Sequence, residues 1–181
     1  MDNFTRRITI ITIALVVVVI FASAVYANLS PGAKAPNFTL PTIDGKSFTL
    51  QDSFKNTPSV VVLDIWATWC PPCRGEIPHL INLQKELKGK HVTIVGVAID
   101  DEKSAVQSFV KEQGVNYTIA LDPRGNKLGK SYGIGGIPAT YIIDKKGVVR
   151  YVHSGFPRDP QEQKHEAAAI KSEINKLMAG K

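Results

Sequence analysis

Two cysteines lie close together in the sequence, and they are the only two among its 181 residues. Cys70 and Cys73 are separated by Pro71 and Pro72. A disulfide across two intervening residues closes a very short loop, so it removes little entropy from the unfolded chain and adds little stability. The pair is therefore better explained by chemistry, as a redox-active dithiol, half of a metal site or a haem attachment.

The residues around the pair decide between these chemistries. Haem attachment needs a histidine directly after the second cysteine, and Arg74 stands there. A zinc site needs four nitrogen or sulfur ligands, and there is no second cysteine pair. We expect the four histidines to be surface residues: His79, His91, His153 and His165. A copper site built from both thiolates with His79 or His153 is an alternative. Otherwise we expect no cofactor beyond the redox-active disulfide.

The segments on either side of the cysteines predict how they are held. Ser59–Trp66 is a nearly continuous apolar run, typical of a strand buried on both faces. After the cysteines, apolar residues recur at helical spacing to Leu87. A helix starting near Cys70 places that thiol among the unpaired N–H groups and positive dipole end of a helix, which stabilise the reactive thiolate. We therefore predict that Cys70 is the exposed nucleophile and that Cys73, one turn deeper, resolves the mixed disulfide.

Asp64 and Pro78 are unusual in these two elements. Asp64 is the only charged residue in Val60–Trp66. An unpaired carboxylate is costly to bury, so its pKa should rise; a salt-bridged or solvent-facing aspartate is the alternative. Pro78 falls inside the predicted helix, where a proline removes a hydrogen bond and kinks the helix.

The rest of the chain predicts an α/β domain in which a βαβ half precedes a ββα half. The turn Asp44-Gly45 between Asn37–Leu40 and Ser47–Leu50 predicts a β-hairpin before the main domain. The later predicted elements are strand Val92–Ile99, helix Ser104–Gly114, strand Tyr117–Leu121, short helix Asn126–Tyr132, strands Ala139–Ile143 and Val148–Ser154, and helix Glu162–Met178. We expect one domain over residues 35–181, after a tether at 28–34.

The N-terminus has a different composition. Residues 1–7 are polar and contain Arg6 and Arg7, whereas Ile8–Ala27 holds twenty residues without a charge. A helix of that length spans about 30 Å, the thickness of a bilayer core. The positive-inside rule leaves residues 1–7 in the cytoplasm and the rest of the chain outside it. The segment is either a retained single-pass anchor or a cleaved signal peptide, because small residues at 22–24 and 25–27 offer cleavage sites.

Composition and charge exclude several classes of protein. The chain is 44% apolar and 21% charged, which is ordinary for a globular protein and excludes a disordered one. Its 22 basic and 16 acidic residues give a net charge of +6. The basic residues are dispersed and form no run long enough to follow phosphates, so we expect no nucleic-acid partner.

Several motifs together resemble one protein family. Trp66–Cys73 resembles the thioredoxin active-site signature, and Tyr132–Thr140 resembles the cis-proline loop of that superfamily. Arg74–Pro78 and Ala35–Leu40 are similar to its TlpA/ResA-like branch. The resemblance covers about Lys34 to Met178. It implies a thioredoxin fold, a central mixed β-sheet flanked by helices, here with an N-terminal β-hairpin extension.

The resemblance also implies an activity and partners. Members are extracytoplasmic thiol-disulfide oxidoreductases at the inner membrane or in the periplasm. This chain would then be a reductant of disulfides in cysteine-containing exported proteins, with apocytochrome c as a candidate. A membrane electron donor would reduce it again.

Five further site residues follow from the resemblance. Asp64 aligns with the buried aspartate that assists proton transfer to the inner cysteine, although many TlpA/ResA-like proteins carry a non-ionisable residue there. Glu76 matches the acidic residue near the dithiol, with a plain surface charge as the alternative. Ile137 and Pro138 would form the cis bond facing the dithiol, and the Ile137 backbone would pair with an extended substrate. Trp69 would frame the site with Trp66, unless Trp66 is a core residue.

Three other functions compete with a reductant. A peroxiredoxin-like peroxidase uses Thr-x-x-Cys, and Thr68-Trp69-Cys70 has the wrong spacing. A disulfide-forming oxidant is disfavoured because Pro72, not histidine, precedes Cys73 and no long helical insertion follows Gly114. A copper-binding assembly chaperone would use the same two thiols to carry Cu(I) without disulfide exchange.

Overall fold

A five-stranded mixed sheet forms the centre of the fold in a computed structural model that describes residues 29–180. Its strands are β3 (Val60–Trp66), β4 (Val92–Ala98), β5 (Thr118–Leu121), β6 (Ala139–Ile143) and β7 (Val149–Ser154). The spatial order is β5-β4-β3-β6-β7, with β3, β4 and β5 parallel and β6 and β7 antiparallel to their neighbours. The predicted mixed sheet is confirmed.

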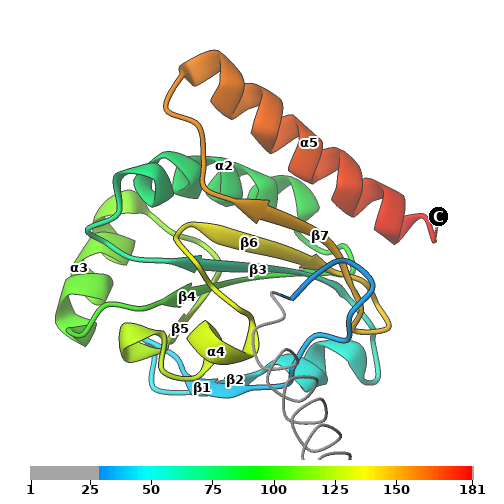
Figure 1. Ribbon diagram of the computed structural model, residues 1–181, viewed down its shortest axis with the longest axis horizontal. Helices are drawn as coiled ribbons and strands as arrows, with labels where there is room; N and C mark the ends of the chain where they lie inside the picture. Colours follow the sequence, from blue (N-terminus) through cyan, green and yellow to red (C-terminus); the bar gives the residue numbers. More distant parts are fainter. Residues whose placement is uncertain (1–28, 181) are drawn as a thin grey trace, which may run out of the picture.

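The other elements lie on the two faces of this sheet (Figure 1). One face is covered by α2 (Pro71–Leu87), α3 (Lys103–Gln113) and α5 (Pro160–Met178). The opposite face carries the hairpin of β1 (Thr39–Pro41) and β2 (Ser47–Thr49), the 3-10 segment η2 (Leu50–Phe54) and the short helix α4 (Leu128–Ser131), which follows η3 (Pro123–Gly125). The predicted thioredoxin-type α/β architecture with an added hairpin is therefore present.

β3 lies at the middle of the sheet, and all seven of its residues are buried. Its side chains alternate between the faces: Val61, Leu63 and Ile65 pack towards the hairpin, whereas Val62 and Trp66 pack towards the helices. A strand buried on both faces needs a continuous apolar run, and this one is broken only by Asp64.

Local chain signals explain where the elements begin. The hairpin turns at Gly45, whose φ of +83° lies in the left-handed region that glycine adopts without strain. α5 begins at Pro160, two residues earlier than predicted, because the Asp159 carboxylate accepts hydrogen bonds from the first free N–H groups of the helix. α2 continues through Pro78 to Leu87, as the apolar spacing predicts.

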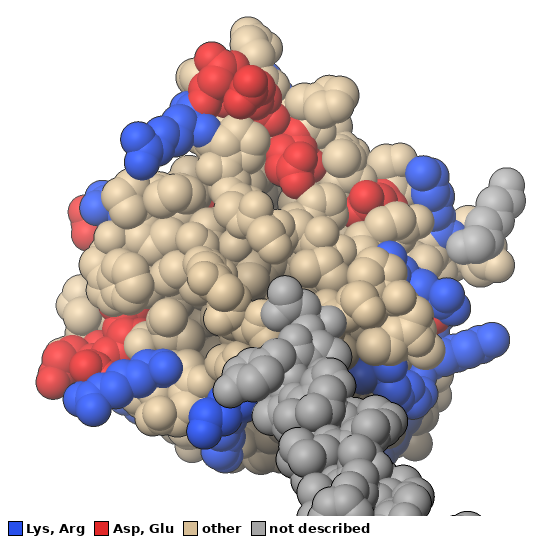
Figure 2. Space-filling view, viewed as in Figure 1, with Lys and Arg blue, Asp and Glu red and all other residues tan. Residues whose placement is uncertain are grey.

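None of the helices between residues 29 and 180 is both long enough and apolar enough to cross a membrane. The predicted segments 1–7 and 8–27 lie outside the described residues. On the face in Figure 2, basic and acidic side chains are scattered around the margin of a largely uncharged surface.

Candidate active site

The two cysteines form a disulfide at the start of α2. Their Cα atoms are 5.3 Å apart. Cys70 is the N-cap residue, with extended backbone angles, and Cys73 lies in the first turn of the helix. β3 ends at Trp66 and α2 begins at Pro71, so the strand-to-helix connection places the cysteines at the carboxyl end of the central strand.

The two prolines direct one backbone amide at the sulfur of Cys70. Pro71 and Pro72 occupy the first helical positions and have no N–H group. The N–H of Cys73 is therefore the first free donor of the helix, and it donates to the Cys70 Sγ at 3.2 Å. Once the disulfide is reduced, this N–H and the positive end of the helix dipole favour the thiolate of Cys70.

The structure corrects the predicted exposure of Cys70. Cys70 is 3% exposed and Cys73 1%, so in this oxidised form both sulfur atoms are buried. Trp69 is 65% exposed and is the only large apolar side chain among residues 29–180 that is open to solvent in this way. Trp66 is fully buried against Phe109. Trp66 is thus the core residue, whereas Trp69 forms exposed apolar surface beside the disulfide.

The Ile137-Pro138 loop lies against the disulfide. The bond between these residues is cis, as predicted. The carbonyl oxygen of Ile137 is 3.7 Å from the Cys70 Sγ. The Pro138 carbonyl accepts a hydrogen bond from the Gly155 N–H at 2.8 Å, which ties the loop to the end of β7. The backbone of Ile137 therefore lies beside the sulfur that a substrate must reach, while its pairing with substrate stays a prediction.

Asp64 is buried on the helix side of β3, with 1% exposure. Its Oδ1 has no hydrogen-bond partner within the described part of the chain. Burial, and then the nearby charge of Glu76, hold the pKa of Asp64 well above its ordinary value. The salt-bridged and solvent-facing alternatives are both wrong.

Glu76 is buried as well, with 2% exposure, so the surface-charge alternative is wrong. Its Oε1 accepts a hydrogen bond from the Thr140 hydroxyl at 2.8 Å, whereas its Oε2 has no partner. Burial raises the pKa of Glu76 to about 7, although the Thr140 hydrogen bond opposes this. One turn after Cys73, the helix thus carries a carboxyl group that can gain or lose a proton near neutral pH.

Other residues contribute to the site without having been predicted. Thr140 is the cross-strand neighbour of Asp64 as well as the donor to Glu76. The buried carboxylate of Asp100 accepts hydrogen bonds from the backbone N–H and the hydroxyl of Thr68, which fixes the loop before the cysteines. His153 was expected at the surface, but its side chain is only 14% exposed and contacts two glutamates. Each depends on which strands are neighbours, which a single sequence does not give.

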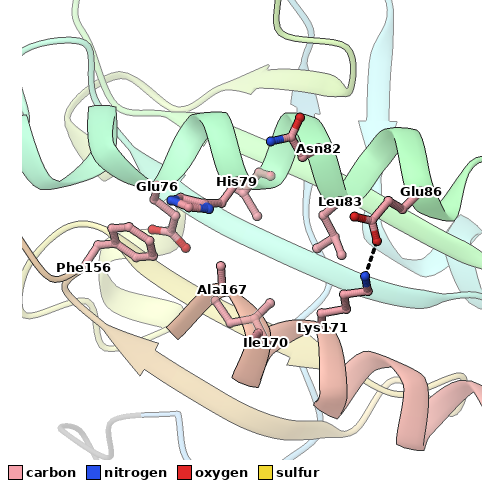
Figure 3. A pocket seen from close by; sticks show the side chains of 11 residues that line it. Glu76, His79, Asn82, Leu83, Glu86, Phe156, Ala167, Ile170 and Lys171 are labelled. Atoms are coloured by element: carbon pink, nitrogen blue, oxygen red, sulfur yellow. Dashed lines mark ion pairs between the residues drawn. The ribbon is translucent and has the colours of Figure 1, made fainter. Parts of the chain in front are cut away.

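A pocket of about 210 Å³ lies between α2 and α5 (Figure 3). Two of the residues singled out from the sequence line it: Glu76, and His79 as the possible copper ligand. The cysteines do not. His79 and Phe156 lie beside Glu76 at one end, and the Glu86–Lys171 ion pair lies at the other. The pocket therefore approaches the buried acid from the α5 side, not the disulfide.

The residues that the structure describes include no group of three or more His, Cys, Asp and Glu side chains arranged to hold a metal ion. Within this part of the chain, the copper alternative lacks a third ligand beside the cysteine pair.

Comparisons with known proteins agree with this geometry. The family described as Redoxin matches residues 30–170. Thiol-disulfide oxidoreductase ResA of Bacillus subtilis (strain 168) is 37% identical over 136 residues, 74% of either chain. ResA of Bacillus thuringiensis (strain Al Hakam) is 36% identical over 118 residues, which are 65% of this chain and 66%, just under two thirds, of that relative. The crystal structure of a thiol:disulfide interchange protein of the thioredoxin family from Chlorobium tepidum TLS has a TM-score of 0.67 and 30% identity. The matched region covers 84% of this chain and 99% of the Chlorobium tepidum chain.

Proposed function

Since the chain belongs to the redoxin family and to its TlpA/ResA-like branch, we propose that it is a thiol-disulfide oxidoreductase that reduces disulfides in exported proteins. The observation that carries the proposal is the Cys73 N–H directed at the Cys70 Sγ at the start of α2. That arrangement favours a thiolate on Cys70, and a thiolate is the species that attacks a disulfide.

The reaction is an exchange of disulfides through a mixed intermediate. The Cys70 thiolate attacks one sulfur of a substrate disulfide, which forms a mixed disulfide and releases the other substrate sulfur as a thiolate. The Cys73 thiol then loses its proton and attacks the Cys70 sulfur. This step forms the Cys70–Cys73 disulfide and releases the second substrate sulfur. Two electrons have then passed from the enzyme to the substrate, together with the one proton that Cys73 gives up; solvent supplies the second proton when both substrate sulfurs end as thiols.

The two buried acids are suited to the proton transfer of the second step. Cys73 is almost completely buried, so water cannot readily take its proton. Glu76 follows it by one helical turn, and its pKa of about 7 lets it hold or release a proton at neutral pH. Asp64 lies on β3, the strand that leads into α2, and burial keeps it protonated at higher pH than an ordinary aspartate.

The exposed surface beside the disulfide is suited to a protein substrate. Trp69 supplies an apolar contact, and the backbone of Ile137 offers an edge for an extended peptide. The predicted segment 8–27 would place the domain outside the cytoplasm, where a membrane electron donor would reduce it again. We propose apocytochrome c as one substrate, and no redox group other than the chain's own disulfide.

The first test is the midpoint potential of the Cys70–Cys73 couple. The full chain in mild detergent is equilibrated with glutathione or dithiothreitol buffers at pH 7, and tryptophan fluorescence reports the redox state. A value below about −200 mV supports a reductant, whereas a value near about −120 mV would make the protein an oxidant.

A second test identifies the substrates. Cys73→Ser removes the resolving thiol and should accumulate mixed disulfides with exported proteins that carry cysteine pairs. The doubly substituted Cys70→Ser, Cys73→Ser chain is the matched control. Equal capture by both variants would contradict the proposal.

A further inference from the structure

A second group of titratable side chains lies on the helix face of the sheet. The Nδ1 of His153 on β7 is 2.6 Å from the Oε1 of Glu166, and its Nε2 is 2.8 Å from the Oε2 of Glu173. Both glutamates belong to α5, and all three side chains are mostly buried. A neutral imidazole has only one N–H group, so hydrogen bonds to two ionised carboxylates require a protonated ring. We call these three residues the histidine clamp.

The strand register brings the histidine clamp next to the buried acids. Thr140 on β6 lies directly opposite Asp64 on β3 and also directly opposite His153 on β7. Side chains in such cross-strand pairs are neighbours on one face of a sheet. Because the Thr140 hydroxyl donates to the Glu76 carboxylate, a continuous polar row connects Glu76 with His153. No mechanistic step described above uses the clamp.

We propose that the histidine clamp is a positioning device: the balance of its positive imidazole and its two carboxylates sets the ionisation of Glu76, and through it the pH range in which the dithiol reacts. The inference rests on the proposed redox function of the cysteine pair. It assigns a role to three residues that touch neither the cysteines nor the substrate-facing loop. His153, Glu166 and Glu173 are therefore positioning residues, not catalytic ones.

The charges around Glu76 act on it in opposite directions. Burial is the main cause of its raised pKa; protonated His153 lowers this pKa, and Glu166 raises it. Burial alone would lower the pKa of His153, but Glu173 and Glu166 outweigh it and raise this pKa. The charged or titratable groups facing the imidazole are Glu166 and Glu173 from α5, Glu76 from α2 and, beyond Thr140, Asp64 from β3. Removing the imidazole should therefore raise the pKa of Glu76, whereas removing the Glu166 carboxylate should lower it.

The experiment follows the Glu76 carboxyl carbon by NMR during a pH titration of the oxidised full chain labelled with carboxyl-¹³C glutamate. Glu76→Gln assigns the signal by its disappearance. In His153→Gln the Glu76 titration should move up by about one pH unit, because two negative charges lose their compensating cation. In Glu166→Gln it should move down by a similar amount, because the imidazole keeps its charge and one partner. His165→Gln, on an exposed position of the same helix, is the matched control and should cause no change.

The second readout is the midpoint potential of the cysteine pair as a function of pH. The pH at which its slope changes should move in the same direction as the NMR titration in each variant. Shifts of the same sign in both clamp variants, or none, would overturn the role of the clamp. If the Glu76 titration shifted but the pH at which the slope of the midpoint potential changes did not, the link between the histidine clamp and the dithiol would be overturned. Neither readout depends on whether the protein is a reductant or an oxidant, and Glu166→Gln alone decides the sign if His153→Gln does not fold.

Discussion

The two faces of the central sheet are packed in different ways. Towards the hairpin, β3 presents Val61, Leu63 and Ile65, which join one apolar cluster with residues of β1, η2 and α4. Towards the helices, the apolar packing divides into two clusters, one around the disulfide and one under α2 and α5. Asp64 lies on β3 between the residues of these two clusters.

This difference separates stability from chemistry. The apolar cluster on the hairpin face contains no buried carboxylate, so its contribution to the free energy of unfolding should not change near neutral pH. The helix face buries Asp64 and Glu76 without ion-pair partners among the described residues, which is unfavourable whenever they ionise. The same burial brings the pKa of Glu76 close to neutrality, where an acid can exchange protons. The apolar packing on the hairpin face thus offsets the free energy that burial of Asp64 and Glu76 costs on the helix face.

The largest expected effect follows from removing the nucleophile. Cys70→Ser should lower disulfide-reductase activity by at least about 1000-fold, because a serine hydroxyl is not ionised near pH 7. Against the reduced wild type, the free energy of unfolding should change by less than about 1 kcal/mol, since both faces of the sheet remain intact. Insulin-reduction assays and urea unfolding measure the two quantities. Residual activity above a tenth of wild type would mean that Cys70 is not the attacking group.

A substitution on the hairpin face should have the opposite profile. Leu63→Ala removes a fully buried side chain and should lower the free energy of unfolding by about 2–5 kcal/mol. The midpoint potential of the folded protein should stay at its wild-type value, because Leu63 points away from the disulfide. Urea unfolding and redox equilibration check this pair of expectations. A changed potential in folded Leu63→Ala would show that the two faces are not separable.

The buried glutamate should make stability depend on pH. Because its pKa is raised from 4.5 to about 7 in the folded chain, the unfolded chain ionises first as pH rises. The contribution of Glu76 to the free energy of unfolding is therefore fully present below about pH 4.5. As the pH rises towards 7, about 3 kcal/mol of this free energy is lost.

Glu76→Gln has no proton to lose, so its unfolding free energy should fall less over this pH range. Urea unfolding of the oxidised wild type and Glu76→Gln at several pH values measures the difference. Parallel curves for the two proteins would show that Glu76 does not titrate in the fold.

Local signals were sufficient for the strands and helices of the main sheet, but not for the 3-10 segments η2 and η3 or for the polar contacts. The apolar run of Val60–Trp66 and the helical spacing to Leu87 predict β3 and α2 from neighbouring residues alone, and the family resemblance adds the cis bond before Pro138. The contacts of Thr140 and His153 depend on which strands lie side by side, which is a property of the whole sheet. The burial of Cys70 depends on the distant Ile137 loop packing over it.

The smallest effect on stability is expected at the end of the α2–α5 pocket that lies away from Glu76. Glu86 and Lys171 form an ion pair across it, about half-exposed on both sides (Figure 3). Lys171→Ala should change the free energy of unfolding by less than about 1 kcal/mol, because exposed charges are well solvated when unpaired. Glu76 lines the same pocket but is buried, so its substitution should have a larger and pH-dependent effect. Urea unfolding of Lys171→Ala at the same pH values measures this contrast. If Lys171→Ala changed the free energy of unfolding as much, and with the same pH dependence, as substitution of Glu76, burial would not be the cause of the difference between the two ends of the pocket.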